Sequence, residues 1–239
     1  GGAATFISQF FGVKDFGSIR KTTGFTLTVA VGISLLFFIV AELFPHQILR
    51  IFTRFPEVID TGVDYVRICA PTFIMLAITQ PFTIALRATQ QTRLPLYASV
   101  IALGTNTFLN YVFIFGKFGA PAMGVAGAAL ATAIARFIEM CLILYMVFGR
   151  KNVISGKINE FFRYGKELAV KVIKNATPTA SNETLWGIGT SLYVAAFARM
   201  GITEGAAIQA CSTINNLFIL ASFSIGDAIL ILVGQKLGE

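Results

Sequence analysis

Long runs of apolar residues alternate with short polar connectors along most of this chain. Six of these runs are long enough for a helix to cross the apolar core of a bilayer, which takes about 20 residues. They are too long, and alternate too little, for the strands of a barrel, whereas a helix in lipid satisfies its own backbone. We predict membrane-spanning helices over 25–44, 68–86, 94–116, 124–148, 176–198 and 206–235, preceded by half a span at 1–11.

The one sizeable polar segment lies between the fourth and fifth predicted spans. Its sequence FFRYGKELAVKVIK sets apolar residues among lysines, which is typical of a helix lying on a membrane surface. We predict such a helix over 159–174. The segment divides the chain into an amino-terminal lobe (1–148), a linker (149–175) and the start of a carboxy-terminal lobe (176–239).

The basic residues are distributed unevenly between the two ends of the predicted spans. Thirteen of the 19 lysines and arginines lie on the side that carries the linker, and five lie on the other side. Because basic loops stay in the cytoplasm, this bias predicts a cytoplasmic linker. The net charge of +7 therefore serves topology and contact with anionic lipid headgroups, and we expect no nucleic-acid partner.

Composition agrees with a protein of the lipid bilayer. Hydrophobic residues make up 55% of the chain, charged residues only 13%, and the mean hydropathy is +0.74, whereas soluble domains carry roughly 25% charged residues. The three cysteines are far apart inside apolar runs, so they predict neither a disulfide framework nor a metal cluster. The chain begins without methionine inside an apolar run, and we expect it to be a fragment.

Polar residues inside the apolar runs are the candidates for chemistry. Asn106 and Asn110 are four residues apart, so they lie on one face of a helix. Each amide can donate and accept hydrogen bonds, and the pair either lines a cavity or joins neighbouring helices. The segment 124–135 that follows is rich in glycine and alanine, which lets membrane helices approach closely.

Two carboxylates lie in the last two predicted spans. Glu183 follows Pro178 by about a turn and a half, and a carboxylate at lipid depth is costly unless it is protonated, paired or faces water. We predict that Glu183 faces the interior between two lobes and carries a proton or cation. The alternative is that it reaches water at the membrane surface. Asp227 either contacts a cation or substrate, or faces a water-filled vestibule without a role.

Three further features are weaker candidates for a functional role. Gln80 precedes Pro81, which either kinks its helix or leaves a free carbonyl in a cavity. Arg136 and Glu139 are three residues apart and can pair on one helix; a structural ion pair is favoured over a relay. The single histidine, His46, and the scattered carboxylates form no catalytic constellation, so we do not expect an enzyme.

One ordered string of motifs resembles a known family. The segment QTRLP, then N-x-x-x-N-Y-x-F-I-F-G beginning at Asn106, then P-x-x-G-V-x-G-A-A-L-A-T resembles helices five and six of MATE (multidrug and toxic compound extrusion) transporters. A fainter repeat of Gln-x-x-Gly begins at Gln9 and again at Gln235. It resembles the exits of helices two and eight in that family. On this resemblance the chain runs from late helix two to the end of helix eight.

The resemblance implies an all-α, polytopic transmembrane helical bundle, part of a two-lobe transporter. It implies a secondary active exporter of organic cations or drugs by antiport with Na⁺ or H⁺, without a cofactor, in a bacterial inner membrane. It also implies that the Asn106–Asn110 pair lines a cavity in the first lobe and that a glutamate near Glu183 is functional. We expect a monomer in the lipid bilayer. The alternative is a lipid-linked oligosaccharide flippase of the related superfamily, whose cavity should be more basic.

Overall fold

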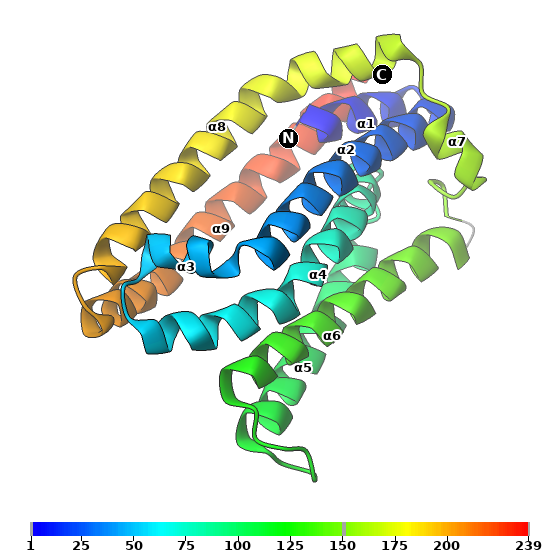
Figure 1. Ribbon diagram of the computed structural model, residues 1–239. Coiled ribbons are helices and arrows are strands. Elements are labelled where there is room, and N and C mark those ends of the chain that lie inside the picture. The colour runs from blue at the N-terminus through cyan, green and yellow to red at the C-terminus, as the bar shows by residue number, and fades with distance from the viewer. Residues whose placement is uncertain (1, 150–151, 239) are drawn as a thin grey trace.

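The computed structural model describes residues 2–149 and 152–238, and every regular element in these ranges is a helix. Gly1, Arg150, Lys151 and Glu239 lie outside the described residues; two of them, Arg150 and Lys151, belong to the basic linker. The helices are α1 (Gly2–Gly12), α2 (Phe16–Leu43), α3 (Pro45–Phe52), α4 (Pro56–Ala88), α5 (Arg93–Phe115), α6 (Gly124–Leu144), the π-helical turn η1 (Tyr145–Gly149), α7 (Ile158–Phe162), α8 (Lys166–Ala198) and α9 (Ile202–Gly238) (Figure 1).

Local sequence explains several helix ends. Asp15 caps the start of α2, where its carboxylate accepts hydrogen bonds from the Ser18 amide (3.0 Å) and hydroxyl (2.6 Å). Proline occupies the first turn of both α3 and α4, where a missing N–H costs nothing. Gly116 ends α5 in the left-handed conformation, with φ of +64°.

Four long helices form the larger packed unit. The helix α4 packs between α2 and α6, and α5 packs against α6 (Figure 1). Most of the tightly buried residues gather at one end of this unit, where α1, α7 and the ends of α4 and α6 meet. There the ring of Phe82 meets the rings of Phe148 (5.6 Å) and Phe161 (5.9 Å) edge to face.

The helices α8 and α9 form a second, smaller unit. They pack against each other as a hairpin and contact the rest of the chain chiefly through α1, which lies along α9 (Figure 1). Most large apolar side chains of this hairpin are exposed, as on a surface that meets lipid or further helices.

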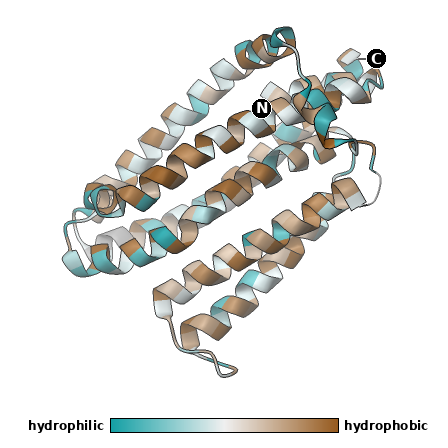
Figure 2. Ribbon diagram, turned by 45° about the vertical axis from the view of Figure 1, so that its right-hand side comes forward, coloured by the Kyte–Doolittle hydropathy of each residue, from teal (hydrophilic) through white to brown (hydrophobic). Residues whose placement is uncertain are grey.

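The helical fold predicted from the sequence is confirmed, with one exception among the expected spans. In the described residues, α2, α4, α5, α6 with η1, and α9 have the length and composition of membrane-spanning helices. The helix α8 is as long as α4, but the polar stretch from Thr177 to Thr184 lowers its hydropathy, and it does not meet the same criterion. Figure 2 shows it as paler than the strongly hydrophobic α2.

The predicted surface helix over 159–174 is divided. The short α7 ends at Phe162, and the chain turns at Arg163 and Gly165 before α8 begins at Lys166 and continues into the polar stretch. Gly165 is extended, a conformation that ends one helix and starts another. By contrast, Pro81 does not end α4, which runs through it without interruption.

Candidate functional site

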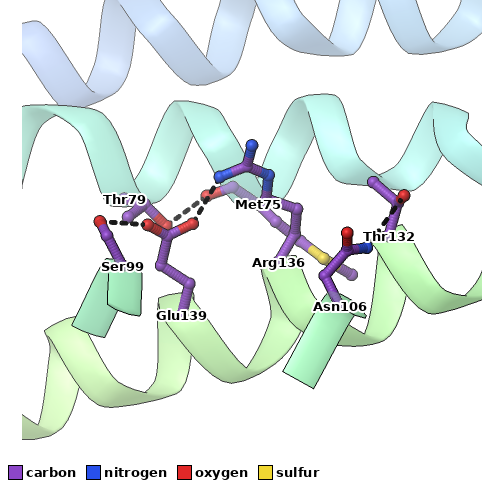
Figure 3. Close-up of polar contacts among 7 residues, drawn as sticks. All are labelled: Met75, Thr79, Ser99, Asn106, Thr132, Arg136 and Glu139. Atoms are coloured by element: carbon purple, nitrogen blue, oxygen red, sulfur yellow. Dashed lines mark hydrogen bonds and ion pairs between the residues drawn. The ribbon is translucent and has the colours of Figure 1, made fainter. Parts of the chain in front are cut away.

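A polar cavity of about 480 Å³ opens between α5 and α6. From α5 it is lined by Ser99, Ala102, Leu103 and Asn106, and from α6 by Thr132, Arg136 and Glu139. Figure 3 shows the polar side chains of the two helices turned toward one another, with α4 behind them. These residues recur at spacings of three and four, which places each set on one helical face.

Close approach of the two helices depends on Gly127. A Cβ atom at this position would lie 2.7 Å from the carbonyl oxygen of Phe113 on α5. The glycine in the predicted small-residue segment therefore lets α6 lie against the α5 backbone, as such residues do in membranes.

Glu139 holds the innermost charge of this cavity. Its Oε2 lies 2.7 Å from Nη1 of Arg136, and its Oε1 accepts a hydrogen bond from the Ser99 hydroxyl at 3.0 Å (Figure 3). The Glu139 side chain is 10% exposed and that of Arg136 is 43% exposed. The predicted pairing is confirmed, and it gives a buried carboxylate the partners that it needs at lipid depth.

The two asparagines continue the polar line along α5. Asn106 donates from Nδ2 to the Thr132 hydroxyl at 3.3 Å, and Asn110 donates to Oδ1 of Asn106 at 3.1 Å. Oδ1 of Asn110 is buried and accepts no hydrogen bond in the described part of the chain. The pair thus joins two helices and still offers an open acceptor, which a cation or a donor from another helix can use.

The other predicted site residues lie elsewhere. Gln80 on α4, Glu183 on α8 and Asp227 on α9 are all exposed, and none of them lines the cavity between α5 and α6. The structure therefore brings Asn106 and Asn110 together with Arg136 and Glu139, but not with the other two carboxylates. The roles of these three exposed residues remain predictions.

A second polar cavity, of about 600 Å³, lies between α8 and α9. Two aromatic rings from α8 face amide and hydroxyl groups from α9 across it; the lining includes Trp186, Thr190, Tyr193, Gln209, Asn215 and Asn216. Sequence analysis did not identify these residues, nor Ser99 and Thr132 of the first cavity. The spacing in the sequence could have identified Ser99 and Thr132. Ser99 precedes Asn106 by two helical turns and Thr132 precedes Arg136 by one, so each lies on the same helical face as a predicted residue.

Known sequences match this chain over most of its length. Residues 1–112 match the MatE family model. The multidrug resistance protein NorM of Vibrio cholerae is 31% identical over 211 residues, which cover 84% of this chain and 44% of that protein. The probable multidrug resistance protein YoeA of Bacillus subtilis is 23% identical over 239 residues, covering 99% of this chain and 52% of YoeA. The chain spans about half the length of these relatives.

Solved structures agree in fold. A crystal structure of MATE in the bent conformation matches with a TM-score of 0.74, covering 99% of this chain and 50% of that one at 17% identity. A MOP superfamily transporter from Pyrococcus furiosus gives a TM-score of 0.75, also at 17% identity, covering 99% of this chain and 50% of that one. The sequence matches, together with the ordered motifs of α5 and α6, show that the chain belongs to the MATE family, whose members are membrane transporters and not enzymes.

Proposed function

We propose that this chain is part of a secondary active exporter of organic cations and related amphiphiles, driven by inward movement of Na⁺ or H⁺. The observation that carries the proposal is the α5–α6 cavity, a charged and amide-lined space inside an apolar helical bundle. Polar groups at lipid depth are costly, so their concentration in one cavity marks a path for ions or polar substrates. The relatives' names, which refer to multidrug resistance and export, support the same substrate class.

The α5–α6 cavity is the proposed site of the coupling ion. Asn106 lines the cavity, and Asn110 donates to its Oδ1 from the next turn of α5 and has an open Oδ1 of its own. Both amide oxygens are neutral, which suits a hard cation. Glu139 supplies a negative charge that Arg136 compensates. This neutral balance disfavours the flippase alternative, because a pyrophosphate-linked sugar calls for an excess of positive charge.

The α8–α9 cavity is the proposed contact for the organic substrate. Trp186 and Tyr193 offer ring faces that attract flat cations, and the amides of Asn215 and Asn216 can orient polar substituents. Glu183 and Asp227 remain candidates for the proton or cation step on the same two helices.

The test uses the complete transporter in inside-out membrane vesicles, with ethidium as the organic cation. Imposed Na⁺ and proton gradients are applied separately, and ethidium movement is followed by fluorescence. We expect Asn110→Leu to reduce gradient-driven transport at least about tenfold, an effect equivalent to about 1.4 kcal/mol. The matched control is Thr107→Val, an exposed position on α5 whose hydroxyl bonds only to the Leu103 carbonyl of its own helix.

Two outcomes would contradict the proposal. Absence of gradient-driven ethidium transport by the unmodified protein would remove the exporter function for this substrate class. Normal transport by a well-expressed Asn110→Leu variant would remove the Asn106–Asn110 pair from ion coupling.

A further inference from the structure

The two copies of the Gln-x-x-Gly repeat meet where α1 and α9 end. A Cβ atom on Gly12 would lie 2.6 Å from the carbonyl oxygen of Gln235, and a Cβ on Gly238 would overlap the carbonyl oxygen of Gln9. The contact is thus reciprocal, since the glycine of each copy receives the glutamine carbonyl of the other. Ser8 is fully buried beside it, against Gly234. This crossing is the main contact between the α8–α9 hairpin and the rest of the chain.

The side chain of Gln235 reaches past this crossing to the end of α4. It is only 6% exposed; its Nε2 donates to the Ala88 carbonyl at 2.9 Å, and its Oε1 accepts from Nε2 of Gln90 at 2.8 Å. Ala88 is the last residue of α4, so its carbonyl has no acceptor role inside the helix. Gln90 has a left-handed backbone, with φ of +62°, a conformation that is uncommon for residues other than glycine.

The turn between α4 and α5 also forms hydrogen bonds with the linker. Gln91 and Asn152 exchange two hydrogen bonds through their side-chain amides, at 2.7 and 2.5 Å. The turn between α4 and α5 therefore joins α9 on one side and the linker on the other. The side chain of Gln9, the repeat counterpart of Gln235, makes no hydrogen bond within the described part of the chain.

We propose that Gln235 and the α4–α5 turn form an amide latch, a set of side-chain hydrogen bonds that holds the two lobes together at the end of the helices that carries the linker. These hydrogen bonds break and form again during each transport cycle. The inference rests on the proposed export function, which requires the two lobes to separate at this end. Amide groups suit such a latch because they exchange partners with water at little net cost. A buried ion pair at the same place would resist separation far more strongly once one partner left.

The test measures opening directly, without transport. A single cysteine, Ser8→Cys, is placed in the complete transporter after Cys69, Cys141, Cys211 and any other cysteines are replaced by serine. A membrane-impermeant maleimide is then applied to inside-out vesicles, with right-side-out vesicles as the control for orientation. Because Ser8 is buried in the closed contact, its labelling rate reports the open fraction.

We expect Gln235→Leu to raise the labelling rate about tenfold, and Gln90→Leu to raise it by a smaller factor, because they remove two hydrogen bonds and one respectively. The matched control is Gln47→Leu, an exposed glutamine on α3, which should leave the rate unchanged. If Gln235→Leu is poorly expressed, Gln90→Leu decides the question, since it alters only the turn.

Labelling that is unchanged in the folded Gln90→Leu and Gln235→Leu variants would overturn the latch, whatever the transport activity. Failure of the export proposal has a different signature, namely no gradient-driven ethidium movement by the unmodified protein.

Discussion

The ion pair inside the α5–α6 cavity gives a quantitative prediction about stability. In Arg136→Leu, the Glu139 carboxylate loses its one charged partner among the described residues and keeps the Ser99 hydroxyl. At 2.7 Å the Coulomb attraction of the pair is about 6 kcal/mol for an effective dielectric constant of about 20. Desolvation offsets most of this attraction, and the 43% exposure of Arg136 adds screening by solvent.

Among the two single variants and the double variant of this pair, Arg136→Leu should therefore be the least stable. We expect Arg136→Leu to destabilise the protein by about 2 kcal/mol, because it leaves a buried charge without its partner. Glu139→Leu should cost about 1 kcal/mol, since the freed arginine can reach water. The double variant should also cost about 1 kcal/mol, because an apolar pair replaces an ion pair. The coupling energy is then about 2 kcal/mol.

The assay is unfolding of the complete transporter in a mild detergent by titration with sodium dodecyl sulfate, followed by circular dichroism. Arg67→Leu is the matched control, since Arg67 is an exposed residue of α4 with no ion pair in the described ranges. A coupling energy below about 0.5 kcal/mol would show that the pair does not act as a unit. If Glu139→Leu lowered the free energy of unfolding more than Arg136→Leu, this would contradict the assignment of Glu139 as the buried residue of the pair.

Three further predictions follow from other sites. Hydrogen bonds from the hydroxyl and then the amide of Ser18 lower the pKa of Asp15 from its ordinary 3.8. The stabilising effect of the Asp15 carboxylate is therefore fully present above its ordinary pKa and is lost as the pH falls through the lowered pKa. Asp15→Ala should cost about 1 kcal/mol at pH 7, and in thermal unfolding this cost should shrink as the pH is lowered through that range. Gly24→Ala should lower stability by about 1–3 kcal/mol, because its Cβ would overlap the carbonyl oxygen of Phe161 and push α7 away. Gly32→Ala, with no atom within 4 Å of the new Cβ, should be neutral or stabilising by up to about 1 kcal/mol in the same detergent titration. The 239-residue chain alone, reconstituted in liposomes under a Na⁺ or proton gradient, should move no ethidium, because alternating access needs two complete lobes. Gradient-dependent extrusion of ethidium by this chain would show that two complete lobes are not needed.

Hydropathy and helical spacing were sufficient to predict most of the fold. The apolar runs predicted the long helices because length and apolar composition alone decide whether a helix fits a bilayer. Spacing also predicted which residues share a face, and the hydrogen bond between Asn106 and Asn110 and the ion pair of Arg136 with Glu139 confirm it. Interactions within one helix are local, so they can be read from sequence.

Contacts between helices could not be predicted in the same way. The partners Thr132 and Ser99 depend on how α5 and α6 are rotated and shifted against each other, and a single sequence does not contain that register. The division between α7 and α8 was missed because the lysine-rich periodicity continues across Gly165. Likewise, the Gln-x-x-Gly repeat indicated that α1 and α9 end in similar sequences, but it did not predict that these two ends contact each other.

The crossing of α1 and α9 also has a consequence for the order in which the protein is made. Gln9 and Gln235 are 226 residues apart, and at a synthesis rate of about 5–20 residues per second α1 emerges roughly 11–45 s before its partner exists. During that interval Gly12 of α1 lacks the Gln235 carbonyl against which it packs in the folded protein. This pair can therefore assemble only after the helices between α1 and α9 have been synthesised, and a ribosome that stalls inside α9 leaves the two helix ends unjoined.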